Sequence, residues 1–183
     1  FTRDGSFIAS FGSSGSEEGQ FNSPWGITID NDGDMYVADW GNDRVQKFSP
    51  AGTHLLTFGG SGLVNGGELN HPANVAVDSE GDVYVTDWGN KRVQIYEPDG
   101  TIITALYGDA VEFSAWAAGV ISANPDAGKA YRRVKDRAPI GLFNRPVGIV
   151  IDEDDNLIVT DSTRGRLQVY TKEKDYMDPQ FNL

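Results

Sequence analysis

Residues 22–46 read NSPWGITIDNDGDMYVADWGNDRVQ, and the same pattern is written twice more along the chain. Residues 70–94 read NHPANVAVDSEGDVYVTDWGNKRVQ, and residues 144–168 read NRPVGIVIDEDDNLIVTDSTRGRLQ. Self-similarity at a fixed period of about 20 to 50 residues indicates a repeat architecture. The sequence therefore predicts an array of equivalent units, each containing one copy of this stretch.

Each complete copy has the pattern of four short strands separated by turns. In the first copy, the apolar and β-branched runs lie at 25–29, 35–38, 44–48 and 54–58. Clusters of Gly, Asp, Asn and Pro between these runs favour tight antiparallel turns. Four antiparallel strands per repeat, arrayed around an axis, make the blades of a β-propeller. The third copy has only three such runs, at 146–151, 157–160 and 166–170.

The shared motif resembles the NHL repeat. Its two parts are N-x-P-x-x-I/V-x-V/I-D and V/I-Y-V-A/T-D-x-x-N-x-R-V-Q, complete in two copies and degraded in the third. Through Asn124-Pro125-Asp126, the chain is also similar to uncharacterised bacterial NHL proteins with a helical insert before the last blade. The resemblance implies an all-β fold, a partial propeller of about three four-stranded antiparallel blades. It further implies half of a six-bladed ring, with a small two-helix insert.

The chain divides into six segments under this interpretation. They are the end of a preceding blade (1–12), blade one with its crossing (13–60), blade two (61–108), the helical insert (109–140), a three-stranded last blade (141–170) and a tail (171–183). The chain starts with Phe1, so we expect a natural N-terminal part to be missing. A chain with a surplus outer strand at one end and a deficit at the other needs a complementary half-propeller to cover its strand edges. That half is either the missing N-terminal segment or a second copy in a homodimer.

The insert combines an apolar stripe with a cluster of basic residues. Apolar residues at helical spacing predict one short helix, and Asn124 followed by Pro125 predicts the start of a second. Two interpretations of the second helix stay open: a solvated face, or a basic lid over a pocket for an anionic ligand. Its basic residues, with one just beyond it, are Lys129, Arg132, Arg133, Lys135 and Arg137.

One face of the predicted propeller is the better candidate for binding. Loops between second and third strands, the crossings between blades and the insert all lie on it, and loops on a rigid scaffold carry most binding function. Trp40 and Trp88 share one repeat position and are expected to pack between blades, whereas Trp25 is replaced by Ala73 and Val147. The ligand-binding residues expected on this face are Trp25, His71, Asn74, Trp116, Lys129, Arg132 and Arg133.

An Asp and an Arg five residues later recur in every copy. A repeated pair across one tight loop is expected to be structural, joined by charge-assisted hydrogen bonds. The pairs are Asp39 with Arg44, Asp87 with Arg92, and Asp161 with Arg166.

Composition limits the classes of function. The formal net charge is −12, which disfavours nucleic-acid partners because an acidic chain repels phosphates. The chain contains no cysteine, which excludes disulfides and thiolate metal sites. No apolar run approaches membrane-spanning length, so no membrane partner is expected. The compartment stays open, with an extracytoplasmic location slightly favoured over a cytoplasmic one.

Two functions remain in competition. The first is a non-catalytic binding or scaffold module that presents loops and the basic lid to a protein, a peptide or a small anionic ligand. The alternative is a metal-dependent enzyme, similar to lactonase or lyase propellers, with its site at the channel mouth. Such an enzyme needs a metal or a histidine acid–base there, and only His71 lies near that face. The sequence leaves an enzyme uncertain and less favoured, with no catalytic residue assigned.

No cofactor and no set of metal ligands is expected, although the resemblance allows a calcium-like ion in the channel. Some related six-bladed propellers hold such an ion through Asn, Asp and Glu side chains. Asn74 is the polar residue among three equivalent channel positions, the others being Gly26 and Gly148. A hard cation takes about six oxygen ligands, so the other half of the ring would have to supply the rest.

Overall fold

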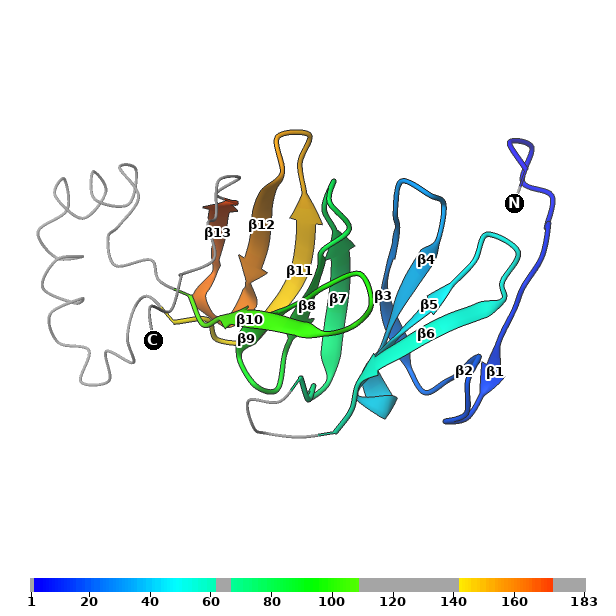
Figure 1. Cartoon of the computed structure of the whole chain (residues 1–183), viewed down its shortest axis with the longest axis horizontal. Helices are drawn as coiled ribbons and strands as arrows, with labels where there is room; N and C mark the ends of the chain where they lie inside the picture. Colours follow the sequence, from blue (N-terminus) through cyan, green and yellow to red (C-terminus); the bar gives the residue numbers. More distant parts are fainter. Residues whose placement is uncertain (1, 62–66, 109–141, 173–183) are drawn as a thin grey trace, which may run out of the picture.

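The computed structural model describes residues 2–61, 67–108 and 142–172. Its strands form three antiparallel sheets that follow one another in sequence and in space (Figure 1). Blade one contains β3 (Pro24–Ile29), β4 (Met35–Asp39), β5 (Arg44–Phe48) and β6 (His54–Gly59). Blade two contains β7 (Pro72–Val77), β8 (Val83–Asp87), β9 (Arg92–Tyr96) and β10 (Ile102–Leu106). Blade three contains β11 (Pro146–Ile151), β12 (Asn156–Asp161) and β13 (Arg166–Thr171).

The prediction of an all-β partial propeller with four-stranded antiparallel blades is confirmed. Sheet orders are β3-β4-β5-β6 and β7-β8-β9-β10, and the last blade is β11-β12-β13. The first strand of blade two, β7, contacts both β3 and β11, so the three first strands lie side by side along the inner edge. The two-helix insert and the tail beyond residue 172 lie outside the described residues. The structure describes three blades, so the six-bladed ring stays a prediction.

Apolar side chains that alternate along the strands form two cores, one between each pair of blades. Between blades one and two, Tyr36, Val45 and Phe58 pack against Val75 and Tyr96. Between blades two and three the equivalent cluster is Tyr84, Val93, Ile95, Phe143, Ile149, Leu157 and Val159. Because strand side chains alternate between faces, a middle blade buries both faces. Blade one and blade three, at the two ends of the described array, each bury only one face.

The acidic turns between first and second strands are local structures. In the first, the Asp30 carboxylate accepts hydrogen bonds from the backbone N–H groups of Asp32 (3.0 Å) and Asp34 (2.9 Å). Asp30 N–H in turn donates to the Asp34 carbonyl at 3.0 Å. Asp side chains that bond their own backbone two residues on define such turns. Asp78 and Asp152 do the same in the other blades.

Two features of the fold were not predicted, one in the first crossing and one in the turns after second strands. Residues 13–23 contain a short parallel pair, β1 (Ser13–Ser14) with β2 (Gln20–Phe21). Two single-turn 3-10 helices, η1 (Trp40–Asn42) and η2 (Ser162–Arg164), replace simple loops after β4 and β12. Within the ranges given above, no helix has the length and apolar character needed to cross a membrane.

Candidate functional site

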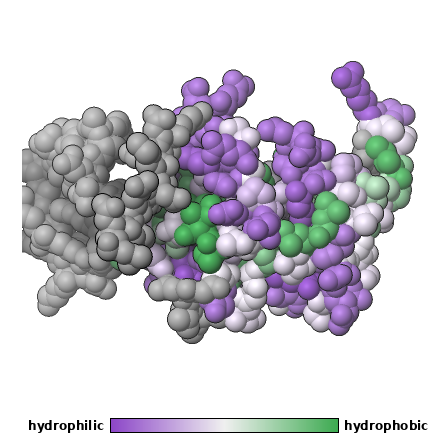
Figure 2. Space-filling view, viewed as in Figure 1, coloured by the Kyte–Doolittle hydropathy of each residue, from purple (hydrophilic) through white to green (hydrophobic). Residues whose placement is uncertain are grey.

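The crossings and the 3-10 turns lie on one face, and the acidic turns lie on the opposite face. In Figure 1, η1 and the segment that leads into β7 are at the bottom, while the β3–β4, β7–β8 and β11–β12 turns are at the top. Figure 2 shows mainly hydrophilic side chains along the edge that carries these turns. The first face, here called the crossing face, contains the described candidate residues for ligand binding.

Each blade carries a buried ion pair beneath the crossing face. The Arg Nε donates to the Asp carboxylate at 2.9 Å between Arg44 and Asp39, at 2.8 Å between Arg92 and Asp87, and at 2.9 Å between Arg166 and Asp161. All three aspartates are fully buried. The same carboxylates accept the backbone N–H of Asn22, Asn70 and Asn144 at 2.7 to 2.8 Å. These three pairs therefore tie the turn between the second and third strands of each blade to the crossing before it.

The Arg side chain also donates hydrogen bonds to backbone carbonyls of the crossing. In blade one, the Arg44 guanidinium donates to the carbonyls of Ser16 (2.6 Å), Glu17 (2.8 Å) and Gln20 (2.8 Å). In blade two, Arg92 donates to the Glu68 carbonyl at 2.6 Å. Burial raises the pKa of Asp87 above its ordinary value, and hydrogen bonds from Arg92, Asn70 and Asn90 offset part of that rise. Through these contacts each described Arg joins the end of the second strand to the preceding crossing.

A row of aromatic and cationic side chains runs across the crossing face from blade one to blade three. Trp25 stacks on Trp40 with centroids 5.2 Å apart and an interplanar angle of 17°. His71 lies edge-on to Trp40 at 4.0 Å, and Trp88 follows at 6.3 Å from His71. The Arg145 guanidinium lies 4.6 Å from the centroid of Trp88. These five residues, from three blades, are called the aromatic row.

The members of the aromatic row differ in exposure and in hydrogen bonding. Trp25 is 54% exposed and Arg145 is exposed, while Trp40, His71 and Trp88 are partly buried. His71 donates its backbone N–H to Asp43 at 2.7 Å, and its ring Nδ1 lies beside the Asn70 amide oxygen. The Trp40 indole Nε1 is buried and finds no acceptor among the described residues. The row therefore offers aromatic ring surface with a guanidinium at one end, and it contains one N–H donor without an acceptor, Trp40 Nε1.

Asn74 lies between the first strands rather than open to a ligand. Its backbone N–H donates to the Thr86 hydroxyl at 2.8 Å, and its side-chain oxygen accepts from Val75 N–H at 2.9 Å. The equivalent residues Gly26 and Gly148 have no side chain to offer. The channel positions in the described part of the chain thus supply one amide oxygen, which is already engaged. They do not fit a calcium-like ion, for which about six oxygens are needed.

Carboxylates gather on the opposite face, where one lysine forms ion pairs with three of them. Asp78, Glu80 and Asp82 offer oxygens within 4.8 Å of one another. Lys172 Nζ, from blade three, reaches these three carboxylates at 2.7, 2.6 and 2.8 Å, in that order. Burial by itself would lower the pKa of Lys172, but the hydrogen bonds to the three carboxylates outweigh it and raise that pKa. The cluster is thus an ion-paired contact between blades two and three.

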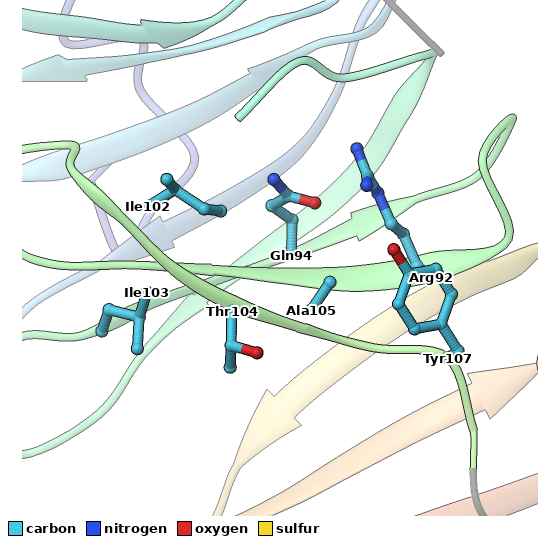
Figure 3. Close-up of a pocket in the computed structure, with 7 residues that line it drawn as sticks. All are labelled: Arg92, Gln94, Ile102, Ile103, Thr104, Ala105 and Tyr107. Carbon is cyan, nitrogen blue, oxygen red and sulfur yellow. The ribbon is translucent and has the colours of Figure 1, made fainter. Parts of the chain in front are cut away.

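A pocket of about 310 Å³ opens on the outer side of blade two (Figure 3). It is lined by Arg92 and Gln94 of β9 and by residues 102–105 and Tyr107. The Gln94 side chain is buried, and its Oε1 has no hydrogen-bond partner among the described residues. In blade one, the equivalent Gln46 oxygen accepts from Gly19 N–H at 2.9 Å. Gln94 and Gln46 occupy the same repeat position, so the repeat pattern alone does not distinguish them.

The structure brings some of the predicted site residues together and separates others. Trp25 and His71 lie in the aromatic row, while Asn74 is held between strands. Trp116, Lys129, Arg132 and Arg133 lie outside the described residues. Arg145 was missed, although it occupies the position of His71 in the third copy, which the aligned repeats could have shown. Trp40 and Trp88, which are expected to pack between blades, lie with ring centroids 6.5 Å apart and are partly buried members of the row.

The model of the NHL repeat matches this chain at residues 21–48, 69–96 and 143–170. E3 ubiquitin-protein ligase TRIM71 of Rattus norvegicus is 46% identical over 46 residues, which are 25% of this chain and 5% of that protein. Protein lin-41 of Caenorhabditis elegans is 44% identical over 48 residues, 26% of this chain and 4% of that protein. The chain therefore spans a small fraction of the length of these relatives.

Solved structures share the fold at low sequence identity. A Bacteroides fragilis protein has a TM-score of 0.53 at 17% identity, over 88% of this chain and 38% of that one. A Bacteroides thetaiotaomicron protein has a TM-score of 0.52 at 17% identity, over 82% of this chain and 35% of that one. Three matched repeats coincide with three observed blades. The chain belongs to the NHL-repeat family.

Proposed function

We propose that this protein is a non-catalytic binding module that presents the aromatic row to a protein or peptide. The observation that carries the proposal is the run from Trp25 through Trp40, His71 and Trp88 to Arg145, assembled from three blades on one face. Trp and Arg are enriched among the residues that contribute most to protein–protein binding. A row of such side chains that crosses three blades suits an extended partner segment.

Repeat comparison indicates that the side chains of His71 and Arg145 are not needed for the blades to fold. Ser23, His71 and Arg145 are equivalent, and all three have a left-handed backbone with φ near +60°, at 56°, 57° and 62°. The crossing fixes the backbone, yet the side chain is a hydroxyl, an imidazole or a guanidinium. A position with constant backbone and changing side chain is free to serve binding.

Charge supports the choice of face. Exposed Lys91 and Arg145 lie on the crossing face, whereas the opposite turns contain ten Asp and Glu residues within 30–34, 78–82 and 152–155. An anionic or polar-acceptor segment is repelled from the acidic face, and Lys91 and Arg145 offer it cations on the crossing face, which also carries the exposed Glu17 and Glu18 of the first crossing. The buried Trp40 Nε1 gains an acceptor if a partner carbonyl reaches it. The E3 ubiquitin-protein ligase TRIM71 has a matching repeat, which is consistent with a protein partner.

We also infer that the three blades are half of a six-bladed ring whose other half is a complementary set of blades. The support is the contrast between inner and end faces: both faces of blade two are buried, while one face of blades one and three carries exposed apolar residues. The enzyme alternative is less supported. The carboxylate cluster Asp78–Glu80–Asp82 already shares the Lys172 ammonium, and it lies away from the crossing face.

Selection of peptides tests the binding proposal. A phage-displayed random peptide library is panned on the purified chain, and the affinity of each selected peptide is measured by fluorescence anisotropy. Trp25→Ala and Arg145→Ala are each expected to weaken binding about 10-fold to 30-fold, because hot-spot residues contribute roughly 1.4 to 2 kcal/mol or more.

The matched control is Glu153→Ala, an exposed charge on the acidic face, which is expected to leave the affinity unchanged. The proposal is overturned if the selected peptides bind the two crossing-face variants as tightly as wild type. It is also overturned if Glu153→Ala weakens binding as much as they do. A poly(U) RNA probe run in parallel is expected not to bind at physiological salt, given the net charge of −12.

A further inference from the structure

Every blade has a buried glutamine at the same position of its third strand, and the glutamine of blade two differs from the others. Gln46, Gln94 and Gln168 are equivalent, and Gln94 is 1% exposed. In blade one the Gln46 side-chain oxygen accepts from Gly19 N–H at 2.9 Å. In blade three the Gln168 oxygen accepts from the Tyr170 hydroxyl at 2.6 Å. The Gln94 oxygen has no donor within the described ranges.

The residues that satisfy Gln46 have equivalents in blade two, and the crossing carbonyls among them are engaged elsewhere. The Gln46 side chain hydrogen-bonds three residues of blade one and its crossing, namely Gly19, Gln20 and Asp39. Their equivalents are residues 67, 68 and 87, all of which the structure describes. The Gly67 carbonyl accepts from the Tyr96 hydroxyl at 2.7 Å. The Glu68 carbonyl accepts from Arg92 at 2.6 Å. The peptide segment that covers the glutamine in blade one therefore leaves the glutamine of blade two without a donor.

The Gln94 amide lies in the pocket of about 310 Å³ that β9 and β10 line on blade two. Figure 3 shows the Gln94 side chain between Ile102 and Arg92, on the same side of the strands. Ile102, Ile103 and Tyr107 are exposed large apolar residues among those that line the pocket. Apolar and aromatic surface therefore surrounds one buried acceptor. Small-molecule sites have this composition, with mostly apolar walls and a few placed polar groups.

The charges at the pocket favour a neutral ligand. An anion is disfavoured because it meets the lone pairs of Gln94 Oε1, and the Arg92 charge is already paired with Asp87 at 2.8 Å. A cation is disfavoured because the Arg92 guanidinium forms part of the pocket wall. A neutral N–H donor satisfies the buried oxygen without burying a charge. In blade one the glutamine pairs with a backbone N–H and a backbone carbonyl, so the matching ligand group is an amide.

We propose that this pocket binds a small neutral carboxamide, whose N–H donates to Gln94 Oε1 and whose oxygen accepts from Gln94 Nε2. A primary carboxamide carries both groups on one edge, so it can pair with the glutamine amide through two hydrogen bonds. The apolar part of the ligand packs against Ile102 and Tyr107, where it is removed from water. This site is separate from the aromatic row, so it goes beyond the proposed function and does not depend on it.

Titration with benzamide, followed by NMR of the chain labelled at its glutamine nitrogens, tests the site. Benzamide is expected to shift the side-chain peaks of Gln94 with a Kd of about 1 mM, which is the range for a fragment of its size. These peaks are identified by their absence in Gln94→Leu. Acetophenone keeps the ring and the carbonyl but lacks the N–H, and it is expected to bind at least about 10-fold more weakly. Equal binding of the two probes would contradict the role of Gln94 Oε1.

Two leucine variants separate binding from folding. Gln94→Leu keeps the approximate size of the side chain and removes the amide, so the affinity for benzamide in saturation-transfer NMR is expected to fall at least about 10-fold. Its urea midpoint should not fall, because the removed oxygen has no donor among the described residues. Gln46→Leu is the matched control. It is expected to keep the affinity for benzamide and to lower the urea midpoint, since Gly19 N–H and the Gln20 carbonyl lose a partner.

A third variant keeps the test decisive if Gln94→Leu folds poorly. Ala105 pairs directly with Gln94 on the outer strand, and Ala105→Phe is expected to fill the pocket and abolish the benzamide shifts while Gln94 stays in place. The proposal is overturned if benzamide leaves the Gln94 peaks unmoved up to its solubility limit, because water or another part of the chain then satisfies the oxygen. It is overturned as well if Gln94→Leu and Gln46→Leu bind benzamide equally.

Discussion

The three ion pairs beneath the crossing face are natural replicates that differ in burial, and they predict a graded loss of stability. The Asp partner is fully buried in each case, but the side-chain exposure of the Arg rises from 3% in Arg92 to 13% in Arg44 and 23% in Arg166. Removing one member of a buried pair leaves the other charge uncompensated, at a cost of about 3 to 5 kcal/mol. Water reduces that cost when it reaches the remaining charge.

Asp87→Ala is therefore expected to lower the unfolding free energy by about 3 to 5 kcal/mol, because the charge of Arg92 stays almost fully buried without its carboxylate. Asp39→Ala removes an equivalent pair, but Arg44 keeps three carbonyl acceptors and is partly hydrated, so about 2 to 3 kcal/mol is expected. Asp161→Ala leaves Arg166 the most hydrated, and about 1 to 2 kcal/mol is expected.

Urea unfolding followed by tryptophan fluorescence measures these losses, and an unchanged slope with denaturant confirms that the transitions are comparable. Asp32→Ala is the control, because its carboxylate is exposed at the tip of a turn, and it should change stability by less than about 0.5 kcal/mol. Equal losses in the three variants, or a larger loss for Asp161→Ala than for Asp87→Ala, would refute burial of the Arg as the controlling factor.

Two further predictions concern contacts between blades. Lys172→Met is expected to lower stability by about 1 to 2 kcal/mol at pH 7, because it leaves three carboxylates close together. The pKa of Lys172 is raised in the folded state, so its contribution to stability is fully present below about pH 10.4 and is lost as the pH rises further. The difference in Tm between wild type and Lys172→Met should therefore stay constant from about pH 7 to 9 and shrink above about pH 10. Gly26→Ala is expected to cost about 1 to 3 kcal/mol in urea unfolding, because a Cβ there would lie 2.4 Å from the Asn74 backbone. Gly148→Ala meets only the Thr160 side chain, at 3.0 Å, and a loss as large as that of Gly26→Ala would contradict the argument.

The strands were predictable because the same strand pattern occurs three times in the sequence, so each copy supports the assignment of the others. A run that is ambiguous alone, such as 166–170, is fixed as a strand by its equivalents at 44–48 and 92–96. The residue just before each copy was not recognised, although Leu69 and Phe143 at that position are buried in the core. Its identity changes between Phe and Leu, so a search for identical letters passes over it.

The site was less predictable because it depends on differences between copies and on contacts across blades. Stacking of Trp25 on Trp40 requires the distance between two strand ends, which periodicity does not provide. Lys172 stands at the border of a tail without strand pattern, and its carboxylate partners are nearly a hundred residues away in sequence. The repeat pattern likewise predicted the Asp–Arg pairing but not the gradient of hydration among the three arginines.

The close approach of the first two blades at Gly26 bears on the curvature of the array of blades. The inner strands β3 and β7 come together where Gly26 faces Asn74, so the absence of a side chain there lets the two blades converge narrowly. The angle between neighbouring blades determines how many of them would complete one revolution. A bulkier residue at position 26 would open that angle, so a change of a few atoms at the inner edge alters the curvature of the whole array.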